Sequence, residues 1–129
     1  MEKRKVLVVD DEQDITLYLC TLLEDHGYAA RSASNGEEAL ARVRAEKPDL
    51  ITLDISMPEK SGVRFYRELR ESDQFKDIPV IMVTGVMKEF EGFIKSRRQV
   101  PPPEGYISKP IDEKEFLCVV ERLLTGTPS

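Results

Sequence analysis

Cysteine and histidine, which build most zinc and thiol sites, are scarce in this sequence. Among its 129 residues are two cysteines, Cys20 and Cys118, which form neither a CxxC pair nor a zinc-ligand spacing. We interpret them as small buried apolar side chains rather than as a disulfide or a metal site. The single histidine, His26, is next to Gly27 near a predicted helix end, which suits a surface histidine better than a catalytic one.

Long hydrophobic runs are missing as well. The N-terminus is basic and then apolar, as in a signal peptide, but its apolar part runs only from Val6 to Val9 before two acidic residues. A signal peptide needs a longer apolar region, and no stretch approaches the length of a membrane span. We therefore expect a cytoplasmic protein without a membrane partner.

The chain also lacks an excess of basic residues. Its formal net charge is -5, and the modest basic cluster of Lys95, Arg97 and Arg98 does not favour direct binding of nucleic acid. Hydrophobic residues make up 40% and charged residues 33%, which is typical of a folded globular protein. We predict a single domain over residues 1–129, with a core from about residue 4 to 124 and a tail from 125 to 129.

Apolar runs of strand length alternate with apolar residues at helical spacing. Strands are predicted over residues 6–9, 28–34, 49–54, 78–85 and 105–108. The predicted helices have apolar residues, including Tyr18, over 15–23, 39–43, 63–69, 86–94 and 116–124. Asn35 and Asp112 are the predicted N-caps, and Gly27 ends the first helix. This alternation indicates an α/β fold, a doubly wound (βα)5 chain whose five-stranded parallel sheet lies between two helical layers.

The residues at the ends of these strands are the candidate site. Asp10 and Asp11 follow the first strand, Asp54 ends the third, Thr84 ends the fourth, and Lys109 follows the fifth. Ligands of open parallel sheets bind at the carboxyl ends of the strands. Three carboxylates, one hydroxyl and one ammonium group are therefore predicted to meet at one edge of the sheet.

Phosphoryl chemistry suits this set of groups. An acidic cluster of oxygen ligands favours Mg²⁺, with Mn²⁺ or Ca²⁺ as substitutes, over zinc. A carboxylate beside such an ion can attack phosphorus and form an acyl phosphate, whose oxygens can bind the metal, Thr84 and Lys109. Each residue also has a simpler interpretation, such as a helix N-cap for the acidic pair or a solvated charge for Lys109. Four strand ends with reactive groups together favour the phosphoryl site.

Four segments together resemble the receiver domain of two-component response regulators, from about Lys5 to Leu124. VLVVDDE is similar to the family's acidic opening, and LDISMPEKSG to its phosphoacceptor loop. VIMVTG is similar to the segment with the switch hydroxyl, and GYISKP to the segment with the switch aromatic, the lysine and a proline. The resemblance implies a flavodoxin-like three-layer sandwich with strand order 2-1-3-4-5.

The resemblance also implies how phosphorylation would work. Asp54 would accept a phosphoryl group from a phosphohistidine of a sensor histidine kinase or phosphotransfer protein. Asp11, Asp54 and the backbone carbonyl of Ser56 would bind Mg²⁺ directly, and Asp10 would bind it through water. Lys109 would pair with the phosphate. The chain would be a signalling phosphoacceptor that catalyses only its own phosphorylation and dephosphorylation.

The resemblance further implies a conformational switch. Thr84 would move toward the phosphate and Tyr106 would follow it inward, which changes the surface around the fourth helix, fifth strand and fifth helix. Without the resemblance, Tyr106 would be interpreted as a half-buried strand aromatic. The Lys109–Pro110 bond is expected to be cis. The output would be contact with a downstream protein or a phosphorylation-dependent homodimer.

Two features depart from the family pattern. Gly85 follows the switch hydroxyl where alanine is usual, and Lys109 follows Thr84 by 25 residues, a few more than the common spacing. The extra length falls around Pro101–Pro103, which we expect to be extended polyproline. We hypothesise that this segment and the arginines before it determine partner choice; the alternative is an exposed loop of no consequence.

Three functions remain open at this point. The first is a phosphorylation switch, as a stand-alone protein or a fragment of a longer regulator. The second is a Mg²⁺-dependent phosphohydrolase, although its signature needs an aspartate where Ser56 lies. The third is an interaction module that has lost phosphorylation, which the intact set of site residues disfavours.

Overall fold

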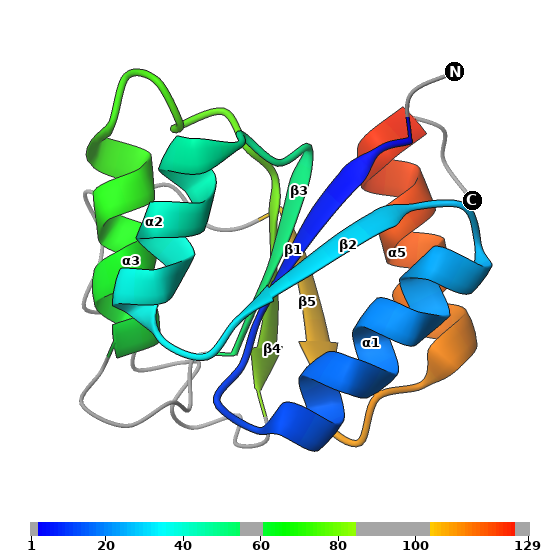
Figure 1. Cartoon of the computed structure of the whole chain (residues 1–129). Helices are drawn as coiled ribbons and strands as arrows, with labels where there is room; N and C mark the ends of the chain where they lie inside the picture. The colour runs from blue at the N-terminus through cyan, green and yellow to red at the C-terminus, as the bar shows by residue number, and fades with distance from the viewer. Residues whose placement is uncertain (1–2, 55–60, 85–103, 126–129) are drawn as a thin grey trace.

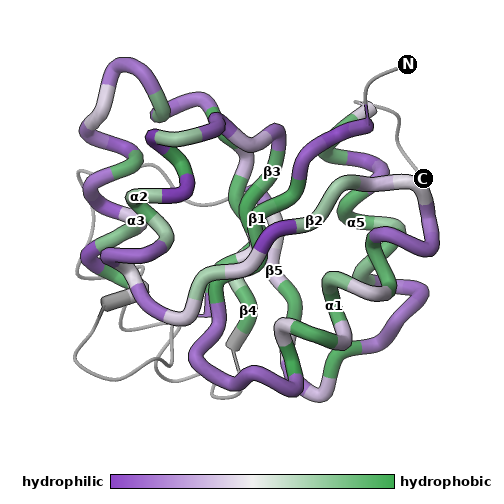
Figure 2. The backbone as a smooth tube through the Cα atoms, viewed as in Figure 1, coloured by the Kyte–Doolittle hydropathy of each residue, from purple (hydrophilic) through white to green (hydrophobic). Residues whose placement is uncertain are grey.

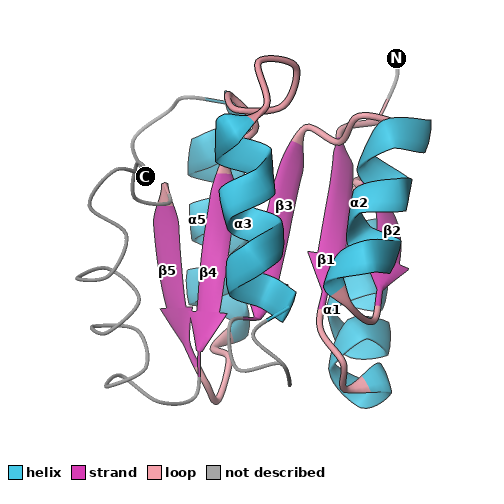
Figure 3. Cartoon of the chain, turned by 90° about the vertical axis from the view of Figure 1, so that its left-hand side faces the viewer, coloured by secondary structure: helices cyan, strands magenta, loops and turns pink. Residues whose placement is uncertain are grey.

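The strands form one parallel sheet. The computed structural model describes residues 3–54, 61–84 and 104–125. Its strands are β1 (Lys5–Val9), β2 (Ala29–Ala33), β3 (Leu50–Asp54), β4 (Val80–Thr84) and β5 (Gly105–Ser108). They lie in the order β2-β1-β3-β4-β5, and Figure 3 shows their arrowheads pointing the same way. The order and the parallel pairing confirm the predicted doubly wound sheet.

Helices cover both faces of this sheet. The described helices are α1 (Gln13–Asp25), α2 (Gly36–Ala45), α3 (Ser61–Glu71) and α5 (Glu113–Thr125). Figure 1 shows α2 and α3 on one side of the sheet and α1 and α5 on the other. None of these helices is long and apolar enough to cross a membrane. The helix predicted over 86–94, the departure at Gly85 and the Pro101–Pro103 segment lie outside the described residues.

The alternation of side chains along each strand divides the core into two clusters. Leu7 and Val9 of β1 pack in the cluster on the α2 and α3 side, and Val6 and Val8 pack in the cluster on the α1 and α5 side. All four side chains are almost fully buried, and each such burial contributes about 1.5–3 kcal/mol. Figure 2 shows hydrophobic colour along the strands at the centre and hydrophilic colour on the outer turns of the helices. The sheet, buried on both faces, thus supports the residues at its edge.

The helix ends follow the sequence signals. Asn35 Oδ1 accepts a hydrogen bond from the Glu38 N–H at 2.8 Å, and Asp112 Oδ1 accepts one from the Glu115 N–H at 2.9 Å. Gly27, just after α1, has a φ of 91°, a left-handed conformation that glycine adopts without strain. The two predicted N-caps and the predicted end of the first helix are confirmed.

Two side chains that the sequence predicts to be buried are exposed in the structure. Tyr18 has an exposed fraction of 43%, because Leu19, Leu22 and Leu23 fill the face of α1 that meets the sheet. Cys118 is exposed and Cys20 is only partly buried, and both are free thiols. The buried residues of α5 are Phe116, Val120 and Leu124. Cys118 is two positions from Phe116, which at 3.6 residues per turn places it on the opposite side of the helix.

A buried arginine joins the end of α3 to the beginning of β5. Arg70 donates from Nη2 to Glu104 Oε1 at 2.6 Å, and the same oxygen accepts a hydrogen bond from the Val80 N–H at 2.7 Å. The Glu104 N–H in turn donates to the Val80 carbonyl at 3.1 Å. These contacts fix Glu104, the residue immediately before β5, and so the point from which the strand starts.

Candidate functional site

The acidic residues after β1 form a turn rather than a helix cap. Asp10 is 3% exposed, and its Oδ1 accepts a hydrogen bond from the Glu12 N–H at 2.9 Å. The N-cap residue of α1 is Glu12, which makes no side-chain cap hydrogen bond. The Asp10 N–H still donates to the Ala33 carbonyl of β2 at 3.1 Å. The interpretation of the acidic pair as an N-cap is therefore wrong, and Asp10 is held as a buried carboxylate at the sheet edge.

Lys109 links the acidic residues of two neighbouring strands. Its Nζ lies 3.1 Å from Asp54 Oδ2, 3.4 Å from Asp10 Oδ2 and 3.8 Å from Glu12 Oε1. Asp54 ends β3 and is 2% exposed. Because β4 lies between β5 and β3, Lys109 must reach across roughly 10 Å of sheet, two strand spacings. A long, flexible cation is the side chain that can do so.

The backbone at the end of β5 sets the position of Lys109. The Lys109–Pro110 peptide bond is cis, the isomer that the resemblance implies. Gly105 begins the strand where α5 approaches closely: a Cβ there would lie 3.0 Å from a methyl group of Val119. The glycine thus allows β5 and α5 to pack together, which sets the position of the segment that contains Lys109.

Charge and burial oppose each other in this site. Burial, together with repulsion from Asp54, raises the pKa of Asp10 from 3.8 to about 6, although the Glu12 N–H and Lys109 lower it in part. Burial alone would lower the pKa of Lys109, but attraction to Asp54, Asp10 and Glu12 more than offsets this, so the pKa is raised. The Lys109 ammonium group is therefore charged throughout the physiological pH range, and it forms ion pairs with Asp54, Asp10 and Glu12.

Replacing Asp10 with asparagine is expected to stabilise the protein at pH 7.5 in the absence of divalent cations. Because folding raises the pKa of Asp10 from 3.8 to about 6, the folded state binds the proton more tightly, and stability falls as pH rises between these values. The asparagine amide is neutral, so burying it does not carry the free-energy penalty of burying the charged carboxylate. We therefore expect Asp10→Asn to raise the free energy of unfolding by about 1–3 kcal/mol at pH 7.5. Urea unfolding at pH 7.5 and at pH 5 measures it. A gain that did not shrink at pH 5 would contradict this explanation.

Oxygen ligands for a divalent cation are present at this edge. Carboxylate oxygens of Asp10, Asp11 and Glu12 all lie within 4.8 Å of one another. This is the one such group of acidic, histidine or cysteine residues in the described part of the chain. Hard carboxylate oxygens suit Mg²⁺ or Ca²⁺ and not zinc. Glu12 was not among the site residues predicted from the sequence. It is the third acidic residue of the run that follows β1, and this position was the signal that could have identified it.

The remaining predicted residues are placed only in part. Thr84 ends β4 with Ser108 as its partner in β5, and the strand residue opposite Asp54 is Val83. Tyr106 lies opposite Met82, on the face of the sheet that α2 and α3 cover, and its side chain is exposed. Partial burial, with a smaller contribution from the charge of Glu104, raises its pKa. Ser56 lies outside the described residues.

Comparison with known proteins gives consistent matches. The sequence profile of the response regulator receiver domain matches residues 6–121. Protein Rrf1 of Nitratidesulfovibrio vulgaris is 34% identical over 128 residues, covering 96% of this chain and 88% of that protein. The alkaline phosphatase synthesis transcriptional regulatory protein PhoP of Bacillus subtilis is 36% identical over 121 residues, covering 94% of this chain and 48% of that protein. The chain thus spans most of one relative and about half of the other.

A solved structure shares the fold at similar identity. The chemotaxis protein CheY4 of Vibrio cholerae aligns with a TM-score of 0.83 and 31% sequence identity. The alignment covers 95% of this chain and 100% of that chain. The likeness in fold therefore extends over nearly the whole chain.

Proposed function

Because the chain belongs to the response regulator receiver domain family, we propose that it is a phosphorylation switch with Asp54 as its phosphoacceptor. Proteins of this family are signalling phosphoacceptors of two-component systems rather than conventional enzymes. The observation that carries the proposal is the buried Asp54 carboxylate with the Lys109 ammonium group 3.1 Å from its Oδ2. An anionic nucleophile beside a fixed cation suits phosphoryl transfer.

The proposed reaction moves a phosphoryl group between two proteins. One carboxylate oxygen of Asp54 attacks phosphorus, the new O–P bond forms as the P–N bond of a phosphohistidine breaks, and the electron pair leaves on the imidazole nitrogen. The Lys109 ammonium group, already at hydrogen-bond distance from Asp54, pairs with a phosphoryl oxygen. The Thr84 hydroxyl donates to another oxygen. Attack of water on phosphorus later breaks the O–P bond to Asp54, releases inorganic phosphate and restores the carboxylate.

The donor set at the sheet edge fits Mg²⁺, with Mn²⁺ or Ca²⁺ as substitutes. The clustered carboxylates of Asp10, Asp11 and Glu12 support this assignment. We assign Asp11, Asp54 and the backbone carbonyl of Ser56 as direct ligands, and Asp10 as a ligand through water. The bound ion would offset the negative charge of the carboxylates and of the phosphoryl group.

The proposed output is a change of surface. Phosphorylation favours a state in which Thr84 contacts the phosphate and Tyr106 turns inward, and this alters the face of the molecule around β5 and α5. The Tyr106 side chain is exposed, so turning inward would bury surface that now faces solvent, and this supports the proposal. The phosphoryl donor is a sensor histidine kinase or a phosphotransfer protein, and the output partner is a downstream protein or a second copy of the chain. We place these events in the cytoplasm and in one domain spanning 1–129.

Phosphorylation by a small donor tests the proposal. Incubation with Mg²⁺ and a small acyl phosphate is expected to add one phosphoryl group, detected by intact-mass spectrometry. A chelator in place of Mg²⁺ is expected to prevent the addition, because the carboxylates of Asp10, Asp11 and Asp54 then repel the donor anion.

Two results would contradict the switch. Rapid multiple turnover on many phosphate esters would indicate a phosphohydrolase instead. No adduct under any condition, in a protein that is folded by circular dichroism, would leave an interaction module without phosphorylation. A single adduct that needs Mg²⁺ excludes both alternatives.

A further inference from the structure

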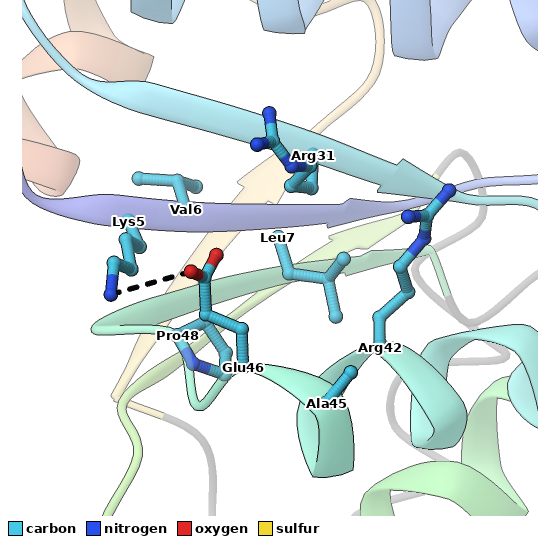
Figure 4. A pocket seen from close by; sticks show the side chains of 8 residues that line it. All are labelled: Lys5, Val6, Leu7, Arg31, Arg42, Ala45, Glu46 and Pro48. Carbon is cyan, nitrogen blue, oxygen red and sulfur yellow. Dashed lines mark ion pairs between the residues drawn. The ribbon is translucent and has the colours of Figure 1, made fainter.

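A pocket lies at the opposite end of β1 from the phosphoryl site. It is bordered by the beginning of β1, by β2 and by the end of α2, and has a volume of about 250 Å³ (Figure 4). Lys5, Arg31 and Arg42 supply its cations, Glu46 its acid, and Leu7 and Pro48 part of its apolar lining. Val9 is four positions after Lys5 along β1, so the Lys5 end of the pocket is roughly 13 Å from the end of β1 that precedes the acidic residues.

Strand register and the end of α2 bring the two arginines to this pocket. Arg31 is the β2 partner of Leu7, so both side chains leave the sheet on the face that α2 covers. Arg42 is in the last turn of α2. Figure 4 shows Arg31 extending from β2 and Arg42 from α2 among the residues that line the pocket. The pocket therefore has a cationic rim contributed by sheet and helix together.

Positive charge at this rim is not balanced. Lys5 Nζ lies 3.5 Å from Glu46 Oε2, and both side chains are well exposed, so this pair is weak. Within residues 3–54, 61–84 and 104–125, neither Arg31 nor Arg42 forms an ion pair. The pocket lining thus has three cationic side chains and one acidic side chain, whereas the chain as a whole has a formal net charge of -5.

Each of the two arginines, considered alone, has a structural role that explains its presence. Arg42 offsets the negative end of the α2 dipole. Arg31 donates from Nη1 to the Ala30 carbonyl at 3.3 Å, which covers a polar group of the edge strand. A guanidinium group has five N–H donors, so both roles leave donors free for an anion. They also do not explain why the two groups border the same pocket.

Size and lining define the ligand. The volume is below the 300–1,000 Å³ that is usual for pockets that bind small molecules, so a side chain fits better than a nucleotide. Guanidinium groups bind carboxylates through paired hydrogen bonds, and the apolar lining suits the methylene groups of a glutamate. We propose that this pocket binds a carboxylate side chain of an acidic segment in a partner protein. This function is additional to phosphorylation and does not depend on it.

The position of the pocket gives the proposal its consequence. Because the pocket and the acidic edge lie at opposite ends of β1, an acidic segment bound here would not cover the edge at which a phosphoryl donor would approach Asp54. The interaction would anchor a partner in both the phosphorylated and unphosphorylated states.

A blocked hexaglutamate peptide is a suitable probe. Added to the ¹⁵N-labelled protein, it is expected to shift the backbone amide signals of Arg31, Arg42 and Ala45 in a saturable way. The double variant Arg31→Gln/Arg42→Gln is expected to bind the peptide at least about tenfold more weakly, because two charge-assisted contacts are lost. The control Arg64→Gln/Arg122→Gln removes the same charge from exposed positions on α3 and α5 and is expected to bind within about twofold of wild type.

Three results would overturn this proposal. Equal weakening in both double variants would mean that the peptide senses only net charge. No saturable shift at the pocket would mean that no acidic segment binds there. Binding of inorganic phosphate to the same amides at lower concentration than the peptide would make phosphate, and not a carboxylate, the ligand. Matching amide spectra of the unbound variants elsewhere in the chain show that they remain folded.

Discussion

Replacing Asp54 with asparagine is expected to reduce phosphorylation by a small acyl phosphate below detection. The asparagine amide has no anionic oxygen to attack phosphorus, whereas the Asp54 carboxylate is buried and lies 3.1 Å from the Lys109 ammonium group. Incorporation of radiolabelled phosphate, with Mg²⁺ present, measures the rate. Asp54→Asn also removes one charge from a crowded acidic edge, so the variant is expected to remain folded.

Asp73→Asn is the matched control for this prediction. Asp73 is fully exposed, and its contact with Lys76 Nζ is long, at 3.7 Å. Its replacement is expected to leave the rate of phosphorylation unchanged. An Asp54→Asn variant that was labelled as fast as Asp73→Asn would contradict the assignment and would direct attention to Asp10 or Asp11.

Replacing Arg70 with methionine is expected to lower the free energy of unfolding by about 3–5 kcal/mol. The Arg70 side chain is 2% exposed and its Nη1 donates to the carbonyls of Lys76 at 2.7 Å and Ile78 at 2.8 Å. Its Nε donates to the Tyr66 hydroxyl at 3.0 Å, and its Nη2 donates to Glu104. Methionine fills similar space but removes the donor to the Lys76 and Ile78 carbonyls and the cation beside Glu104, and buried groups that lose such partners are costly.

Arg64→Met tests whether burial is the cause. Arg64 is on the same helix, its side chain is 82% exposed, and it forms an ion pair with Glu68 four residues along. Exposed pairs of this kind contribute little, so we expect a change within about 0.5 kcal/mol. Urea unfolding followed by circular dichroism compares the two variants. Similar losses in both would mean that the Arg70 contacts contribute no more than a surface pair.

Local sequence signals were sufficient for the sheet and the helix ends. Val6–Val9 and the other apolar runs have strand length, and Asn35 and Asp112 are residue types that are preferred as N-caps before an apolar periodic segment. The convergence of Asp10, Asp54 and Lys109 followed from one rule, that the carboxyl ends of parallel strands share an edge. Their roles in phosphoryl transfer stay predictions.

Features that depend on packing between distant segments were not predictable. Tyr18 has helical spacing with the residues that α1 buries, but the face of the sheet beneath is already filled by Leu19, Leu22 and Leu23. Nothing local marks Arg70 as buried, because its partner Glu104 is 34 residues away along the chain. The pocket between Arg31 and Arg42 likewise requires the register of β2 and the end point of α2.

The most direct test of the phosphoryl site is to locate the acyl phosphate in the chain. Hydride reduction converts a phosphorylated aspartate to homoserine, and tandem mass spectrometry of the peptides identifies the converted residue. Four acidic residues, Asp10, Asp11, Glu12 and Asp54, lie at this edge, and reduction distinguishes them in the protein without a substitution. We predict homoserine at position 54 alone, and only after incubation with Mg²⁺. Conversion at Asp10 or Asp11, with Asp54 unchanged, would contradict the account.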